Sequence, residues 1–152
     1  MSENTLRPPR YLKPMNRLMK AVQKLGIPTG PAMVLTVPGR RSGQPRSTPM
    51  TPFDYRGGLY VVAGYPGADW AANARAAGAG TLARGRRRRQ VRIVELTAHD
   101  ARPVLRAFPA KVPVGVAFAK RSGLVRDGSP DEFEALAGRL AVFRFDPIDT
   151  PQ

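Results

Sequence analysis

The sequence contains no cysteine and a single histidine, His99, among 152 residues. Without cysteine there is no disulfide framework, no thiol nucleophile and no thiolate ligand for a metal. One histidine is too few for a histidine-built metal centre, and we expect His99 itself to lie on the surface. A serine nucleophile would lack a credible base, and the Gly-x-Ser-x-Gly turn of serine hydrolases is absent. The sequence therefore predicts no metal site and no thiol or serine nucleophile.

Acidic residues are also scarce: 11 Asp and Glu stand against 25 Lys and Arg, which gives a formal net charge of +14. A chain this basic is expected to meet an anionic partner, which could be nucleic acid, an anionic membrane or an acidic small molecule. No apolar run approaches the roughly 20 residues that span a bilayer. The polar start of the chain does not resemble a signal peptide, so we expect the cytoplasm as the location.

At this length the chain is expected to form one domain over residues 11–150, preceded by a flexible tail over residues 1–10. The first expected element is a helix over residues 11–25, with apolar residues on one face and basic residues on the other. Such a helix more often packs on its own domain. It can also lie on an anionic membrane, here at the inner face of the plasma membrane.

Short β-type runs separated by turns follow this helix. We expect strands over Met33–Val37, residues 47–53, Leu59–Ala63, a hairpin of residues 81–84 and 91–96, and residues 140–145. Pro49 and Pro52 cannot donate to a β-ladder, so the second strand should lie at an edge or carry a bulge. The pattern predicts an α+β protein, built as a small barrel of mostly antiparallel strands with flanking helices.

Three helices are expected between or after these strands. One runs over Asp69–Ala77, with Asp69 as its cap and Gly78 as its end. A second covers residues 97–107, where Pro103 is tolerable only if the helix starts near residue 100. A third starts at a capping box of Ser129 with Glu132 and runs to about residue 137. Residues 109–128, rich in proline and glycine, are expected to be irregular and to form a lid or a substrate wall.

The densest charge in the chain lies between residues 84 and 92, at the expected hairpin tip. The simpler interpretation is a solvated turn. The alternative is a nucleic-acid contact through phosphates. The tip carries no aromatic residue to stack on bases, which argues against single-stranded ligands and makes nucleic acid an unlikely partner.

A second basic turn, over residues 39–51, carries three arginines, four hydroxyls and two glycines between two strands. The guanidinium fork matches phosphate and carboxylate oxygens, and glycines let backbone N–H groups turn toward the same oxygens. The turn is therefore predicted to hold the acidic end of a small ligand; the alternative is an ordinary basic surface turn. Because dinucleotide and phosphate-loop motifs are absent, redox chemistry would come from a borrowed cofactor with an apolar ring and an acidic tail.

The run LTVPGRRSGQPRSTPM over residues 35–50 resembles the signature of the deazaflavin-dependent nitroreductase family, which reads Thr-x-Gly-Arg-Lys/Arg-Ser/Thr-Gly-x-x-Arg. A second match, DWAAN over residues 69–73, stands where the family shows Trp-x-x-Asn. The two motifs cover roughly residues 33–85 and together are fairly specific. The resemblance implies a split β-barrel that binds reduced coenzyme F420 and passes on a hydride. A flavin mononucleotide relative is the alternative, but the double arginine favours the longer, more acidic tail of F420.

Carried over by position, the resemblance assigns residues to the cofactor. The phosphate and glutamate tail would meet Arg40, Arg41, Ser42 and Arg46. The ring would be lined by Ser47, Thr48, Pro49, Met50 and Thr51 and flanked by Val62, Ala63, Gly64 and Tyr65. The short helix would close the pocket with Asp69, Trp70 and Asn73. Trp70 could instead fill the core, and Asn73 could simply bind a loop. Tyr65 is the candidate catalytic proton donor, with solvent as the alternative.

Two departures from the family bear on the substrate. This chain has Gly64-Tyr65 where well-known members carry Ser-Lys, and it has no tyrosine beyond Tyr65. Phe118 and Phe133 are the nearest counterparts of the aromatic residues that shape the substrate site. Nitroimidazole activation is therefore doubtful, and quinones, enones or other conjugated acceptors are expected. A non-catalytic cofactor- or lipid-binding barrel and a basic nucleic-acid-binding protein are the alternative functions.

Overall fold

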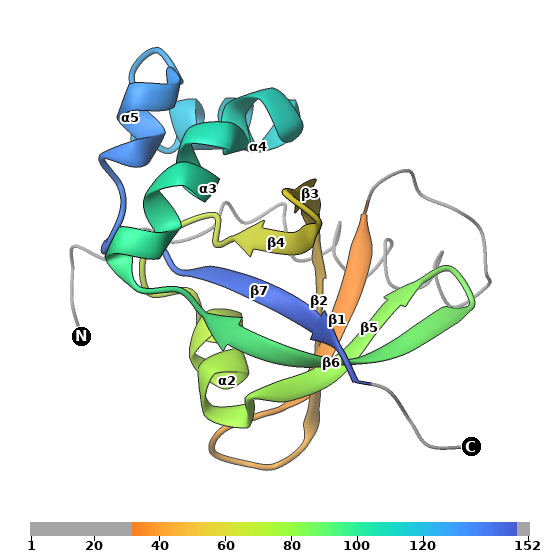
Figure 1. The fold of residues 1–152 in the computed structure, drawn as a ribbon. Coiled ribbons are helices and arrows are strands. Elements are labelled where there is room, and N and C mark those ends of the chain that lie inside the picture. Colours follow the sequence, from red (N-terminus) through yellow and green to blue (C-terminus); the bar gives the residue numbers. More distant parts are fainter. Residues whose placement is uncertain (1–31, 149–152) are drawn as a thin grey trace.

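The computed structural model describes residues 32–148, so the expected tail and the helix over residues 11–25 lie outside the described residues. Within them, seven strands form one curled antiparallel sheet, a half-barrel, in the order β2-β1-β5-β6-β7-β4-β3 (Figure 1). The strands are β1 Met33–Pro38, β2 Pro45–Met50, β3 Phe53–Tyr55, β4 Gly58–Val62, β5 Ala79–Arg84, β6 Arg87–Glu95 and β7 Val142–Pro147. The helices are α2 Asp69–Ala77, α3 Ala98–Lys111, α4 Pro113–Arg121 and α5 Pro130–Glu134. The predicted α+β class is confirmed.

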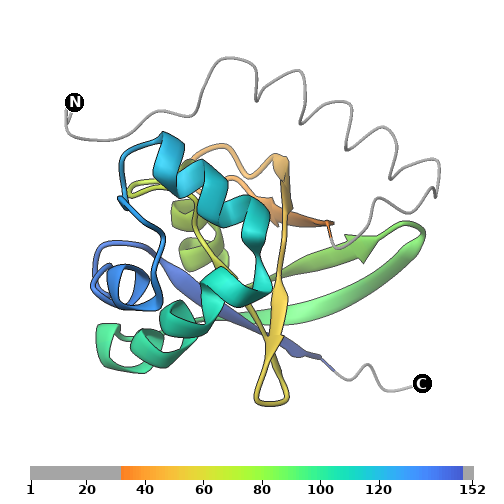
Figure 2. The same ribbon diagram turned by 90° about the horizontal axis from the view of Figure 1, so that it is seen from above.

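Residues 32–148 form two apolar clusters. One lies inside the curled sheet and under α2, and Leu35, Val91 and Phe143 are its most buried large side chains. The other joins α3, α4 and α5 to the β3–β4 end of the sheet around Leu105 and Phe133. Figure 1 shows α3, α4 and α5 gathered together, apart from α2, and Figure 2 shows the molecule from above.

The proline-bearing second strand lies at an edge of the sheet, as predicted. It pairs with β1 from Pro45 to Met50, and the chain leaves the ladder at Thr51 and Pro52 before β3 begins. Because proline has no N–H to donate, an edge position leaves no neighbouring strand unsatisfied. One stretch predicted as a single strand is therefore two edge strands on opposite sides of the sheet.

Helix α2 spans the predicted residues, but its predicted cap is wrong. Ala68 is the N-cap residue, and no side chain caps the helix there. Asp69 is the first helical residue, where its charge still favours the positive end of the helix dipole. The predicted end is confirmed: Gly78 has a φ of 69° and donates its N–H to the Ala74 carbonyl.

The irregular segment predicted over residues 109–128 is largely helical instead. Helix α3 begins after Thr97, whose hydroxyl accepts from the Asp100 N–H, and it continues through Pro103 and Pro109 to Lys111. Helix α4 then begins with a proline at its first position, where the missing N–H has no helical partner to lose. Tertiary packing overrides the local breakers.

The capping box is confirmed: Ser129 and Glu132 bond each other's backbone at the start of α5. The helix is shorter than predicted, since it ends at Glu134, and residues 135–141 turn before β7 begins at Val142. The arginines Arg87–Arg89, predicted at a hairpin tip, belong to strand β6. No helix among residues 32–148 is long and apolar enough to cross a membrane.

Candidate functional site

An apolar cavity of about 360 Å³ lies between the edge strand β2, the end of β4 and helices α3 and α4. Its size is in the range of small-molecule sites. The structure brings to this one cavity most of the residues predicted to surround the ring, together with both predicted substrate residues: Thr48, Pro49, Met50, Thr51, Val62, Ala63, Gly64, Tyr65, Trp70, Phe118 and Phe133. Phe133 is only 1% exposed and belongs to the core behind the cavity wall. Ser47 does not line the cavity, and its hydroxyl lies 2.7 Å from that of Thr36.

Sequence reasoning missed eight residues of this wall, four of them on α3 and α4. The missed residues are Val61, Phe108, Val112, Val114, Gly115, Ala119, Leu124 and Leu140. The four-residue spacing of Val104, Phe108 and Val112 would have extended the α3 prediction past Pro109. Gly115 is required in α4 because the Phe108 ring occupies the space that a Cβ would take. Phe118 approaches β4 across the cavity, 3.4 Å from the place of a Cβ on Gly64.

Residues 39–46, which we call the arginine turn, lie at the end of β2 that is remote from the cavity. Their own hydrogen bonds close this turn. The Gly39 N–H donates to the Gln44 carbonyl at 2.8 Å, and the Gly43 N–H donates to the Gly39 carbonyl at 2.9 Å. The Ser42 hydroxyl accepts from the Gln44 N–H at 3.1 Å. Gly43 has a φ of 74°, which glycine adopts without strain. The turn is therefore a defined structure.

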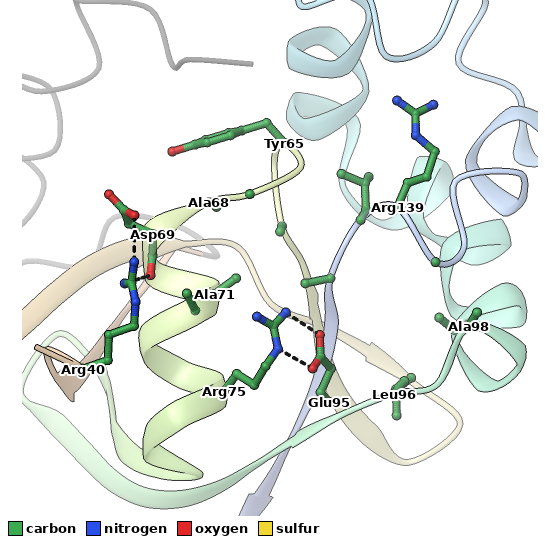
Figure 3. A pocket seen from close by; sticks show the side chains of 17 residues that line it. Arg40, Tyr65, Ala68, Asp69, Ala71, Arg75, Glu95, Leu96, Ala98 and Arg139 are labelled. Carbon is green, nitrogen blue, oxygen red and sulfur yellow. Dashed lines mark hydrogen bonds and ion pairs between the residues drawn. The ribbon is translucent and has the colours of Figure 1, made fainter. Parts of the chain in front are cut away.

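Arg40 is directed from this turn onto α2. The Asn73 side-chain oxygen accepts from the Arg40 N–H at 3.1 Å and from Arg40 Nη1 at 2.8 Å. Arg40 Nη2 lies 3.4 Å from Asp69 Oδ1 (Figure 3). Asn73 is a buried polar residue, 9% exposed. Asn73 thus binds the arginine turn, which is the second of the two roles considered for it.

The other two arginines are not held in this way. The Arg46 side chain and the Ser42 hydroxyl both lie against Gly39, with Arg46 Nε at 3.3 Å and Ser42 Oγ at 3.1 Å from the place of a Cβ. Arg41 is exposed. Neither Arg41 nor Arg46 makes an ion pair within residues 32–148. The structure therefore brings Arg46 and Ser42 together and turns Arg40 toward α2.

Strand β2 connects the arginine turn to the apolar cavity. Its register on β1 runs from Pro45 opposite Pro38, beside the turn, to Met50 opposite Met33, beside the cavity. At about 3.4 Å per residue, the step from Arg46 to Thr51 is about 17 Å. A ligand with an acidic tail and a flat apolar ring could lie along this edge strand, with its charge at one end and its ring at the other.

Tyr65 lines the apolar cavity and also a second cavity of about 320 Å³ on the other side of it (Figure 3). Burial raises the pKa of Tyr65, and the nearby Asp69 carboxylate raises it further. The hydroxyl therefore stays protonated at neutral pH. Sequence reasoning did not predict the second cavity. Its floor is an ion pair between Arg75 and Glu95, at 2.6 and 2.7 Å, which lowers the pKa of Glu95.

Trp70 combines the two roles considered for it. Its ring packs against Phe143, with the ring centres 5.6 Å apart, and it also lines the apolar cavity. The side chain is thus held by the core on one side and open to the cavity on the other.

The curled antiparallel half-barrel places this chain in the split-barrel fold class. The sequence over residues 12–123 matches the model of the F420H(2)-dependent quinone reductase family, and the chain belongs to that family. The predicted kinship with deazaflavin-dependent reductases is confirmed, and coenzyme F420 is the cofactor.

Solved structures share the split-barrel fold at low identity. One described as a domain-swapped dimer is 15% identical, with a TM-score of 0.54 over 90% of this chain and 99% of that one. A putative pyridoxamine 5'-phosphate oxidase from Listeria innocua is 12% identical, with a TM-score of 0.50 over 89% and 94%. A nimC/nimA family protein from Clostridium acetobutylicum is 19% identical, with a TM-score of 0.51 over 85% and 79%. No curated protein matches the sequence.

The residues present fit coenzyme F420. The cavity offers an apolar slot for a flat ring, and the turn offers the guanidinium groups of Arg41 and Arg46 to an acidic tail.

Proposed function

We propose that this protein uses reduced F420 to reduce a quinone or a similar conjugated acceptor in the apolar cavity. The observation that carries the proposal is the continuity of one strand, β2, from the basic turn to the apolar cavity. A family match at the level of F420-dependent oxidoreduction supports it. Enones and nitro compounds remain further candidate acceptors.

The cofactor supplies a hydride at its ring, so the protein needs no nucleophile of its own. The acidic tail would be bound by Arg41, Arg46 and Ser42. Arg40 would add those of its guanidinium N–H groups that are not already bonded to Asn73 or Asp69. The β2 residues and Trp70 would hold the ring. The apolar residues of α3 and α4 would form the acceptor side and exclude water, which keeps the hydride from side reactions.

Tyr65 is the residue we assign to proton delivery. Its side chain lies at the junction of both cavities, and its raised pKa keeps the proton available at neutral pH. A quinone that accepts a hydride on one oxygen or carbon needs a proton on the other oxygen. The Tyr65 hydroxyl can donate that proton and recover it from solvent through the second cavity.

The test is anaerobic mixing of the purified protein with reduced F420 and a panel of quinones that includes menadione, while the absorbance of oxidised F420 is followed. We expect catalytic return of that absorbance with quinones and slow or no return with nitroimidazoles. Tight F420 binding without turnover on any acceptor would instead indicate a carrier.

The same assay tests Tyr65. A Tyr65→Phe variant keeps the ring and removes the proton, so kcat should fall about 100-fold while the Kd for F420 is unchanged. An unchanged kcat would assign the proton to solvent.

A further inference from the structure

The hairpin of β5 and β6 ends in a segment that we call the basic arm, residues 82–89. Both views show this hairpin projecting away from the helices (Figures 1 and 2). Its five arginines are all exposed: Arg84, Arg86, Arg87, Arg88 and Arg89. Leu82 is buried at its base, and no exposed apolar side chain stands at its tip.

The basic arm holds like charges close together. Arg84 lies directly opposite Arg87 across the hairpin, and like charges in that position are destabilising. Residues 79–92 contain no Asp or Glu. Among the residues that the structure describes, Arg87 and Arg88 make no ion pair. The repulsion between Arg84 and Arg87 opposes folding, and no ion pair within residues 32–148 offsets the charge of Arg87. We therefore expect these charges to meet an anionic surface outside the protein.

The distribution of the arginines matches a thin anionic layer. Alternation along β6 places Arg87 and Arg89 on one face of the hairpin and Arg88 on the other. The three residue pairs from Arg84 to Leu82 extend over about 7 Å. The headgroup layer of one leaflet is about 5 to 8 Å thick. A hairpin that enters this layer end-on would contact lipid phosphates from both faces without reaching the hydrocarbon.

The sheet register places the basic arm and the apolar cavity at the same end of the sheet. Pro49 of the cavity wall pairs with Val34, which pairs with Ala83, which pairs with Arg88. The arginine turn lies at the opposite end, beyond Val37 and Pro38. The arm is therefore separate from the site proposed for the acidic tail of F420, which lies at the opposite end of these strands.

We propose that the basic arm docks this protein on the anionic phospholipid headgroups of a membrane. Arginine pairs with phosphate bidentately, and each basic residue near such a surface strengthens binding. The consequence for catalysis, access to acceptors dissolved in lipid, rests on the proposed function. The binding itself does not.

The test is sedimentation of the full chain with vesicles of phosphatidylglycerol and phosphatidylcholine, against vesicles of phosphatidylcholine alone. Arg87→Gln with Arg88→Gln should weaken binding to the anionic vesicles about 25-fold, since each arginine contributes about fivefold. The matched control, Arg102→Gln with Arg126→Gln, removes the same charge from other exposed sites and should leave most of the binding intact. Binding of the native chain should fall as salt rises.

Three results would overturn the proposal. Equal binding by the arm and control variants would assign membrane contact to another segment, such as residues 11–25. Equal binding to vesicles without anionic lipid would exclude phosphate recognition. Displacement from the vesicles by duplex DNA at matched phosphate concentration, lost in the arm variant, would assign the arm to nucleic acid. None of these measurements uses turnover, so failure here is distinct from failure of the reductase assay.

Discussion

The two arginine-rich turns of this protein differ in how they are held. The turn at residues 39–46 is closed by backbone hydrogen bonds, and its Arg40 is fixed by Asn73 and Asp69 on α2. The basic arm at residues 82–89 places two arginines opposite each other, and residues 79–92 around it contain no Asp or Glu. Preorganised donors suit a small ligand of fixed shape, because little ordering is left for binding. A row of exposed like charges suits an extended anionic surface.

The first prediction concerns the ligand that each turn binds. Arg46→Ala should raise the Kd for F420 about 10- to 100-fold, the usual effect of losing a hydrogen bond to a charged group. The hydride step at saturating cofactor should change little, because the side chain lies at the far end of β2 from the cavity. Arg88→Ala in the basic arm should leave the Kd unchanged. Titration and single-turnover rates measure both quantities, and equal cofactor affinity in the native chain and Arg46→Ala would remove the distinction between the turns.

The second prediction tests whether the hydrogen bonds that fix Arg40 on α2 matter for cofactor affinity. Asn73→Ala removes the acceptor of two Arg40 donors and should raise the Kd for F420 about 5- to 10-fold with kcat unchanged. Asn73→Asp retains an oxygen acceptor and should restore most of the affinity. Asn73 is thus a positioning residue that acts through Arg40. If both variants bind F420 as the native chain does, the link to α2 serves stability alone.

A third loop, residues 126–128, differs from both turns because the carboxylate of Glu132 binds its backbone. Glu132 accepts from the backbone N–H groups of Arg126 at 2.7 Å and of Asp127 and Gly128 at 2.8 Å, and these bonds lower its pKa from 4.5 to about 2. A lowered folded-state pKa contributes stability that is fully present above pH 4.5 and lost as pH falls toward 2. Glu132→Gln should therefore lower the melting temperature by a few degrees at pH 7.

The difference between Glu132→Gln and the native chain should shrink below pH 4.5 and disappear near pH 2. Melting curves across that range provide the check. A difference that stays constant with pH would mean that the charge of Glu132 is not what holds the loop.

Local sequence signals predicted the elements that depend on local chemistry. Apolar runs located β1 and β4, Gly78 ended α2, and Ser129 with Glu132 started α5. These signals failed where contacts between residues distant in sequence determine the secondary structure. Pro109 indicates a break, yet α3 continues through it. Gly115 also lies within a helix, α4, and residue 115 is a glycine there because the Phe108 ring occupies the space of a Cβ.

The candidate site shows the same division. The arginines of the basic turn were predictable as a set, because residue type and spacing are local properties. The direction of Arg40 was not, since it depends on Asn73, 33 residues away. The second cavity was not predictable either, because α2, the start of α3 and residues 138–141 meet there only in the folded chain.

The smallest expected effect separates the two turns by stability. Arg87→Gln removes a like charge opposite Arg84, so the melting temperature should rise by about 1 to 3 °C. Arg40→Gln, by contrast, loses the ion pair with Asp69 and should lower it. Because the repulsion is between exposed charges, the gain in Arg87→Gln should vanish at high salt. A higher melting temperature together with weaker vesicle binding would mean that Arg87 serves binding to a partner at a cost in stability. A lower melting temperature would instead mean that Arg87 stabilises the hairpin, so that the fold alone explains its charge.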